Sequence, residues 1–345
     1  MLLEPRSLEL LERGPDLLER LPANGRFKLE MPASQLELLT VPHRDVPAAI
    51  AELAQARRTL LDALEGLARP AAAGAHPFSA GQGALNPGPR YERTATEYGP
   101  VAQRQLVCAL QVHVAVGGAE RTLSVYNALR EHLPLLAALA ANAPFYEGQD
   151  TGLASVRPLI AGLLPRQGVP PPLEGWDELE RELRWGAAAG SVPDPSSWWW
   201  ELRPHLEFGT LELRVPDAQT TLAEAGAIAA VAQALIAWLA EEGDADPAPS
   251  WRIEENRWAA CRHGVEGSFA DLRSGERRPA RECLHSLIDR IEPFAERLGA
   301  ARPLAHARHM VEENGALRQR EAAREGGPRG LAEWLVGGFA DGIRG

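Results

Sequence analysis

The chain has 345 residues and a formal net charge of −11, with 36 Lys and Arg against 47 Asp and Glu. This length suits about two average domains or one large α/β or α+β domain. The acidic balance argues against a nucleic-acid partner, which would require a basic stripe. Hydrophobic residues make up 45% of the chain, too many for a disordered protein. Because we find neither a signal peptide nor an apolar run of roughly 18 residues, we expect no membrane partner.

Cysteine and lysine usage narrow the class of protein further. The three cysteines are widely spaced and form no CxxC motif, which excludes a disulfide scaffold or zinc knuckle and suits a cytoplasmic protein. Lys28 is the only lysine, and it lies in the segment Arg-Phe-Lys-Leu-Glu rather than after a glycine. A nucleotide site of the Walker type is therefore excluded.

The first elements follow from alternation and helical periodicity. The segment 34–40 alternates like a strand, and residues 45–67 predict an amphipathic helix with Asp45 as N-cap and Pro47 in its first turn. Residues 68–100 are rich in Pro and Gly and predict a long irregular connection, which in a compact enzyme is often functional.

The rest of the chain alternates between strand and helix patterns. We predict a strand over 104–116, a helix over 119–141 with a kink at Pro134, a short helix over 174–187, a strand over 209–216, a helix over 221–242 and a mostly helical part over 251–345. The half-polar strands favour a mainly antiparallel sheet with helices packed on one face, which is an α+β fold.

Three predicted strands place a metal-competent side chain on their polar face. These residues are Glu37, with Glu30 just upstream, His113 and Glu212. Several carboxylates with one imidazole suit Mg²⁺ or Mn²⁺. The alternative is an ordinary solvated face, and the strand pattern by itself does not decide between the two.

Two arginines accompany Glu212. Arg203 precedes it, and Arg214 follows it by two residues, so that Glu212 and Arg214 project from the same face of one strand about 7 Å apart. A guanidinium beside a metal-binding carboxylate suits phosphoryl transfer, because it balances charge on the transferring group. The alternative is a cross-strand ion pair that contributes little to stability.

Several motifs in order resemble one known family. They include Gln111-Val-His113-Val-Ala, the stretches from Tyr126 to Arg157, Arg203-Pro-His through Phe208-Gly-Thr-Leu-Glu-Leu-Arg214, and Glu255-Asn-Arg-Trp-Ala-Ala-Cys-Arg262. Together they resemble the glutamate–cysteine ligase type 2 family, whose members are also called carboxylate–amine ligases. The resemblance runs from about residue 2 to about residue 300.

The resemblance implies a single glutamine-synthetase-like domain over residues 1–345, with a curved, mainly antiparallel sheet. It implies ATP-dependent joining of the γ-carboxylate of glutamate to an amine such as cysteine through an acyl phosphate, with Mg²⁺ (or Mn²⁺) as the metal. The partners would be small molecules, and family members are commonly homodimers, although no stripe in the sequence identifies an interface.

The resemblance also implies roles for individual residues. Glu37, His113 and Glu212, and more weakly Glu30, match the metal ligands of the family. Arg214 matches a phosphate-facing arginine and, with Arg203, would be catalytic. Arg157 and Arg203 would hold a substrate carboxylate, with a bracing ion pair as the alternative for Arg157. Asn256, Arg257 and Arg262 would either line the nucleotide or brace the site, and we favour bracing.

Some positions depart from the pattern of the family. Met1-Leu-Leu-Glu-Pro5 matches only the end of an opening strand whose glutamates are metal ligands in the family. Gln111 replaces the first histidine of a His-x-His motif, Ala115 replaces a glycine, Glu201 replaces an aspartate and Glu207 replaces an arginine. The alternative function is therefore an impaired homologue that binds a ligand or partner without turnover.

Overall fold

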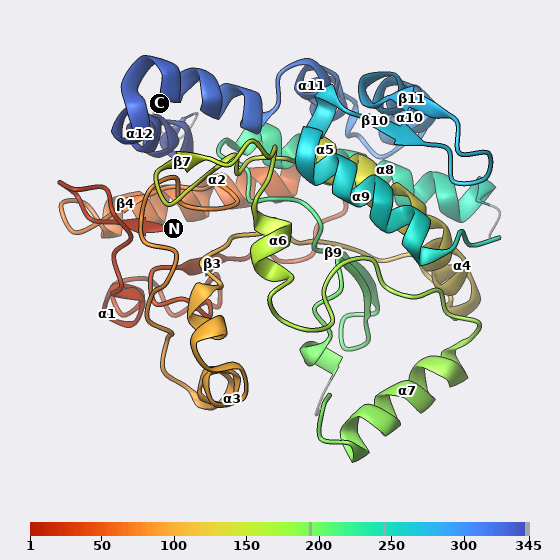
Figure 1. Cartoon of the computed structure of the whole chain (residues 1–345), viewed down its shortest axis with the longest axis horizontal. Helices are drawn as coiled ribbons and strands as arrows, with labels where there is room; N and C mark the ends of the chain where they lie inside the picture. Colours follow the sequence, from red (N-terminus) through yellow and green to blue (C-terminus); the bar gives the residue numbers. More distant parts are fainter. Residues whose placement is uncertain (193–194, 244–245, 342–345) are drawn as a thin grey trace.

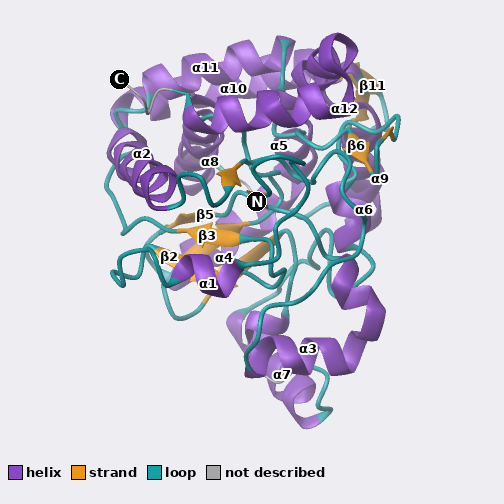
Figure 2. Cartoon of the chain, turned by 90° about the vertical axis from the view of Figure 1, so that its left-hand side faces the viewer, coloured by secondary structure: helices purple, strands orange, loops and turns teal. Residues whose placement is uncertain are grey.

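The computed structural model describes residues 1–192, 195–243 and 246–341. Short antiparallel strands lie beneath a layer of helices (Figure 1, Figure 2). The strands are β1 (Leu2–Leu3), β2 (Phe27–Leu29), β3 (Leu36–Leu38), β4 (Arg69–Pro70), β5 (Val112–Val114), β6 (Phe145–Tyr146), β7 (Gln149–Asp150), β8 (Leu202–His205), β9 (Thr210–Leu213), β10 (Ser268–Ala270) and β11 (Arg277–Pro279).

Helices account for most of the regular structure. They are α1 (Gly14–Leu18), α2 (Val46–Ala63), α3 (Pro89–Tyr98), α4 (Ala119–Leu129), α5 (Leu133–Leu139), α6 (Arg157–Ala161), α7 (Trp176–Ala188), α8 (Leu222–Glu242), α9 (Ser250–His263), α10 (Ala280–Arg297), α11 (Ala301–Glu312) and α12 (Gly315–Ala340). The predicted helical part after residue 250 is confirmed by α9 to α12.

The sheet that positions the site has the strand order β5-β9-β8, and both of its pairings are antiparallel. Leu202, Leu211 and Leu213 point to one face and are fully buried. They belong to the main core with α4, α8 and α10, so this face is the one that the helices cover. The opposite face carries the polar side chains, as the predicted alternation requires.

Helix α8 forms the centre of that core. Thr221 and Glu224 make a capping box at its start, which satisfies backbone N–H groups that have no partner within the helix. By length and composition α8 could cross a membrane, with a mean hydropathy of 1.7 over its most apolar window, contrary to our expectation of no such run. However, 67% of that window is buried inside the protein, as in the core helix of a globular fold.

Several predicted boundaries need correction. The strand expected over 104–116 shrinks to Val112–Val114, and the preceding residues make only isolated bridges such as Ala109 with Asp217. The predicted irregular connection 68–100 contains α3. The predicted helix 119–141 is interrupted by a 3₁₀ turn, Arg130–His132, directly before α5, where Pro134 occupies the first turn.

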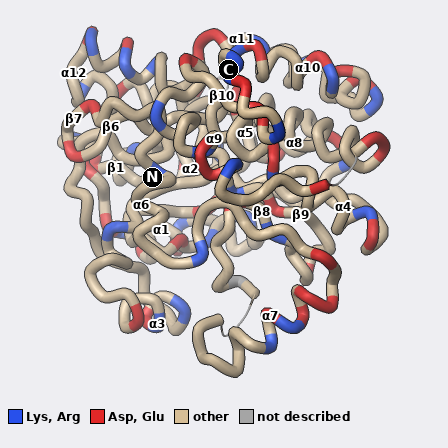
Figure 3. The backbone as a smooth tube through the Cα atoms, turned by 45° about the vertical axis from the view of Figure 1, so that its right-hand side comes forward, with Lys and Arg blue, Asp and Glu red and all other residues tan. Residues whose placement is uncertain are grey.

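Asp45 caps α2 as predicted, because its side chain accepts a hydrogen bond of 2.8 Å from the backbone N–H of Ala48. Acidic and basic residues are interspersed along α7 (Figure 3), where Glu180 and Arg184 pair one turn apart. This polar helix lies at the edge of the molecule, well apart from α3 (Figure 1).

Candidate functional site

Three predicted site residues lie side by side on the polar face of the β5-β9-β8 sheet. His113 is the register partner of Glu212, and Glu212 is in turn the partner of Arg203. Arg214 lies two residues beyond Glu212, so its side chain shares this face. The structure therefore brings four of the predicted residues together across three strands.

Glu212 is held between two arginines. Its Oε2 accepts a hydrogen bond of 2.5 Å from Nε of Arg203, and its Oε1 accepts one from Nη1 of Arg214. Glu212 is only 1% exposed. Burial acts to raise the pKa of Glu212, but Arg214 and Arg203 outweigh burial and lower it. The carboxylate therefore stays charged near neutral pH.

His113 has one ring nitrogen engaged, since Nδ1 lies 3.1 Å from the Thr210 hydroxyl. Burial lowers the pKa of His113, Glu212 opposes that shift, and His205, Arg203 and Arg214 add to it. The imidazole is therefore neutral near pH 7, the form in which it ligates metals.

A cavity of about 1010 Å³ extends between β3 and β5 and reaches α2, α3 and the β8–β9 hairpin. Its lining includes the predicted residues Glu30, Glu37, His113, Arg157 and Arg214. Burial raises the pKa of Glu37, and the carboxylates of Glu30 and Glu212 raise it further, against Lys28 and Arg214. Glu37 thus lies within electrostatic range of Glu212, although the two strands belong to different sheets.

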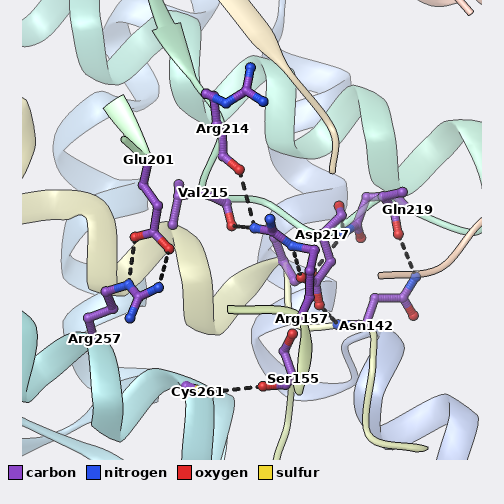
Figure 4. Close-up of polar contacts among 12 residues, drawn as sticks. Asn142, Ser155, Arg157, Glu201, Arg214, Val215, Asp217, Gln219, Arg257 and Cys261 are labelled. Carbon is purple, nitrogen blue, oxygen red and sulfur yellow. Dashed lines mark hydrogen bonds and ion pairs between the residues drawn. The ribbon is translucent and has the colours of Figure 1, made fainter. Parts of the chain in front are cut away.

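Arg157 has partners inside the protein. Its Nε donates to Oδ1 of Asp217 at 2.7 Å, and its Nη2 donates to the backbone carbonyls of Arg214 and Val215 at 3.2 and 2.5 Å (Figure 4). Asp217 also accepts a hydrogen bond of 2.7 Å from the backbone N–H of Asn142. These contacts correspond to the bracing alternative for Arg157, because they hold the chain just after β9.

Asn256 and Arg262 contact other parts of the protein. The side chain of Asn256 makes hydrogen bonds of 2.7 and 2.9 Å with the backbone of Ala270, and Arg262 donates to the carbonyl of Gly152. Arg257 forms a two-pronged ion pair with Glu201, with N–O distances of 2.8 and 2.7 Å (Figure 4). These contacts of Asn256, Arg257 and Arg262 correspond to the bracing alternative, which we favour.

The donor set is suitable for a hard divalent cation. Glu37 and Glu30 supply carboxylates on the cavity wall, and His113 has Nε2 available in addition to the occupied Nδ1. Among residues 1–192, 195–243 and 246–341, however, no three His, Cys, Asp or Glu side chains converge as a ready-made metal site. Both oxygens of Glu212 are taken by arginines.

Some cavity residues escape the sequence-based prediction. Arg90 and Tyr91 at the start of α3, Trp199, and Phe208 in the β8–β9 hairpin all line the cavity. Arg90 also helps to lower the pKa of Arg203, which is mainly lowered by burial. Arg90 and Tyr91 lie in the Pro-rich connection over residues 68–100. Because connections of that length are often functional, this position could have indicated Arg90 as a site residue.

Antiparallel strands covered by helices, with arginines around a buried glutamate beside a cavity, define a protein of the glutamate–cysteine ligase fold class. The chain belongs to the glutamate–cysteine ligase family 2, whose family model matches residues 4–332.

Relatives in sequence cover almost the whole chain. A protein from Rubrobacter xylanophilus with the provisional name glutamate–cysteine ligase 2-3 is 39% identical over 343 residues, which is 97% of this chain and 91% of the relative. A Micrococcus luteus protein with the provisional name glutamate–cysteine ligase 2 is 33% identical over 347 residues, covering 95% of this chain and 86% of the relative.

Solved structures confirm the fold class. A glutamate–cysteine ligase from Francisella tularensis, in complex with AMP, superposes with a TM-score of 0.73 at 14% identity, covering 96% of this chain and 86% of that one. A bifunctional glutathione synthetase from Pasteurella multocida has a TM-score of 0.65 at 14% identity, covering 92% of this chain and 49% of that one.

Proposed function

We propose that the chain is an ATP-dependent carboxylate–amine ligase that joins the γ-carboxylate of glutamate to an amine such as cysteine. The observation that carries the proposal is the register of His113, Glu212 and Arg203 across three strands, with Arg214 and Glu37 on the wall of the adjoining cavity. We propose further that the whole chain acts as one ligase domain in the cytoplasm.

The proposed reaction has two steps, and in each step one bond forms as another breaks. An oxygen of the γ-carboxylate attacks the γ-phosphorus of ATP, the bond to ADP breaks, and an acyl phosphate forms. The amine nitrogen then attacks the acyl carbon, phosphate leaves, and the new amide nitrogen loses a proton.

The arginines of the site have a definite task in this scheme. Arg214 lies on the cavity wall, and Glu212 fixes the direction of its guanidinium. Arg203 supports Glu212 from the neighbouring strand. Fixed cations that face the transferring group lower the barrier because they need no reorganisation as negative charge shifts between oxygens. Glutamate would enter with its carboxylates toward this cationic wall, where Arg90 adds a further guanidinium.

Glu37, His113 and Glu30 would hold a divalent cation if their side chains drew together around it, and the cation would then supply positive charge to the phosphate oxygens of bound ATP. The AMP complex of the Francisella tularensis ligase supports a nucleotide in a protein of this fold.

One observation favours the alternative, an impaired homologue that binds a ligand without turnover. Glu212 directs both of its oxygens to arginines, so a metal bound by Glu212 would have to share an oxygen with a guanidinium whose charge opposes that of the metal. Without Glu212, the metal would rest on the cavity carboxylates and His113 alone.

Phosphate release decides between the two functions. The full chain is incubated with ATP, Mg²⁺, glutamate and a panel of amines, and inorganic phosphate is measured. The ligase predicts release that requires both glutamate and an amine. Absence of release with every amine, from protein that binds ATP, would support the impaired homologue instead.

A further inference from the structure

Three aromatic rings gather at the tip of the β8–β9 hairpin. The rings of His205 and Phe208 stack with centroids 4.1 Å apart and planes 16° from parallel. His113 meets both rings edge-on, at 5.2 Å from His205 and 5.6 Å from Phe208. The stack therefore lies on the same polar face of the sheet as Glu212.

The hairpin holds this stack in place. His205 pairs with Thr210 in the antiparallel register, and Gly209 adopts a positive φ of 62°, which suits glycine in a tight turn. The backbone N–H of Phe208 donates to Nδ1 of His205 at 3.3 Å, which orients the imidazole beneath the phenyl ring.

Phe208 remains largely exposed although His205 and His113 contact it. His205 occupies one face of the phenyl ring, yet the residue is 62% exposed and lines the cavity. Trp199, another ring on the cavity wall, already has the Arg166 guanidinium over it at 5.4 Å and Tyr98 against it at 5.9 Å. Phe208 is thus the ring better placed to accept a new stacking partner.

The charged groups of the site lie a short distance from the stack along β9. Thr210 adjoins the stack, and Glu212, with its two arginines, is two residues further, or about 7 Å in a β-strand. A ligand that suits both ends has a planar ring at one end and several negative charges at the other. A nucleoside triphosphate has this chemistry, and its ribose spans the distance between.

We propose that the His205–Phe208 stack is the platform for the base of the nucleotide, with the phosphates directed along β9 toward Arg214. This inference rests on the proposed function for its choice of ligand. Stacking on a phenyl ring tolerates any base, so the platform contributes affinity for nucleotides in general rather than a preference for adenine.

The test compares a ligand that has a base with one that lacks it. ATP and inorganic tripolyphosphate, each with Mg²⁺, are titrated by calorimetry into the full chain and into Phe208→Ala, Phe208→Tyr and Leu206→Ala. Leu206 is the matched control, because it lies in the same hairpin, is 54% exposed and is also apolar.

We expect Phe208→Ala to raise the Kd for ATP by about 5- to 100-fold and to leave the Kd for tripolyphosphate within about twofold. Phe208→Tyr keeps the ring and should bind ATP like the unmodified chain, as should Leu206→Ala. The inference is overturned if Phe208→Ala binds ATP normally, if both ligands weaken equally, or if the unmodified chain binds ATP no better than tripolyphosphate.

Failure of the platform and failure of the proposed ligase give different results. If Phe208→Ala weakens ATP alone while no amine supports phosphate release by the unmodified chain, the platform stands and the ligase fails. If the unmodified chain releases phosphate and Phe208→Ala leaves KM for ATP unchanged, the ligase stands and the platform is wrong.

Discussion

Arg157 and Asp217 form a buried ion pair, with Nε of the arginine 2.7 Å from Oδ1 of the aspartate. The pair connects the start of α6 to the segment that leaves β9, 60 residues further along the chain. Because Arg157 also binds the carbonyls of Arg214 and Val215, the position of Arg214 in the cavity depends on this pair (Figure 4).

The first prediction concerns the stability that the pair supplies. Asp217→Asn leaves the Arg157 guanidinium buried without its carboxylate, so we expect the free energy of unfolding to fall by about 3–5 kcal/mol. Urea unfolding followed by circular dichroism measures the loss. Asp150→Asn is the matched control, because Asp150 also pairs with an arginine, Arg320, but at the surface.

We expect Asp150→Asn to lower the free energy of unfolding by less than about 1 kcal/mol, because solvated ion pairs contribute little to stability. Equal losses in Asp217→Asn and Asp150→Asn would show that burial of the Arg157–Asp217 pair has no special weight.

The second prediction concerns Glu212. Glu212→Gln removes the charge that orients Arg203 and Arg214, and we expect Mg²⁺-dependent ATP binding to be lost. Calorimetry with ATP, in Mg²⁺ and in EDTA, measures the effect on protein whose folding has been checked by circular dichroism. Glu207→Gln in the exposed hairpin should bind ATP normally. Unchanged ATP affinity in folded Glu212→Gln would refute a role for Glu212 in the nucleotide site.

The sequence predicts some of the contacts in this site but not others. Residues two apart on one strand share a face, so the neighbourhood of Glu212 and Arg214 follows from alternation. The pairing of β9 with β5, and the contact of Arg157 with Asp217, join residues far apart in sequence. No periodic pattern encodes such contacts: alternation placed His113 and Glu212 on the polar faces of two strands, and the resemblance to a family favoured one shared site over an ordinary solvated face.

Helix α3 is an element of the fold that the sequence did not predict. None of its residues is buried, its sequence has few apolar side chains, and its Pro-rich surroundings favour a loop. In contrast, α2 has a capping aspartate and an apolar face, and its predicted start is confirmed.

A third prediction concerns acid sensitivity and rests on His76. The ring is buried, Nε2 faces the carbonyl of Leu8 at 2.9 Å, and Nδ1 accepts from the backbone N–H of Ser79 at 2.9 Å. These contacts require the neutral form, and burial lowers the pKa of His76 to about 4. The unfolded chain, with an ordinary histidine pKa near 6.5, therefore binds the proton first as the pH falls.

The stability contributed by neutral His76 is thus complete above about pH 6.5 and is lost as the pH falls toward 4, by about 3 kcal/mol in total. Urea unfolding of the unmodified chain and of His76→Gln at pH 7 and pH 4.5 measures it. We expect the difference in unfolding free energy between the two proteins to narrow at the lower pH. A difference that is the same at both pH values would contradict the assignment.

A final prediction concerns Glu201, which stands where the family pattern has an aspartate. Its carboxylate makes two hydrogen bonds to Arg257, both side chains are largely buried, and the pKa of Arg257 is raised mainly by Glu201 against the effect of burial. Glu201→Gln removes the charge and should lower the free energy of unfolding by about 3–5 kcal/mol. Glu201→Asp keeps the charge on a shorter side chain that reaches fewer of the guanidinium N–H groups, so we expect a loss of only about 1–2 kcal/mol.

Urea unfolding of the two variants separates charge from side-chain length. The backbone carbonyl of Glu201 accepts the N–H of Arg214 at 2.8 Å, so displacement of Glu201 would also move Arg214. Glu201→Asp should therefore retain ATP binding as well as most of the stability. Equal losses for Asp and Gln would mean that the fit of the side chain, and not its charge, holds α9 against the sheet.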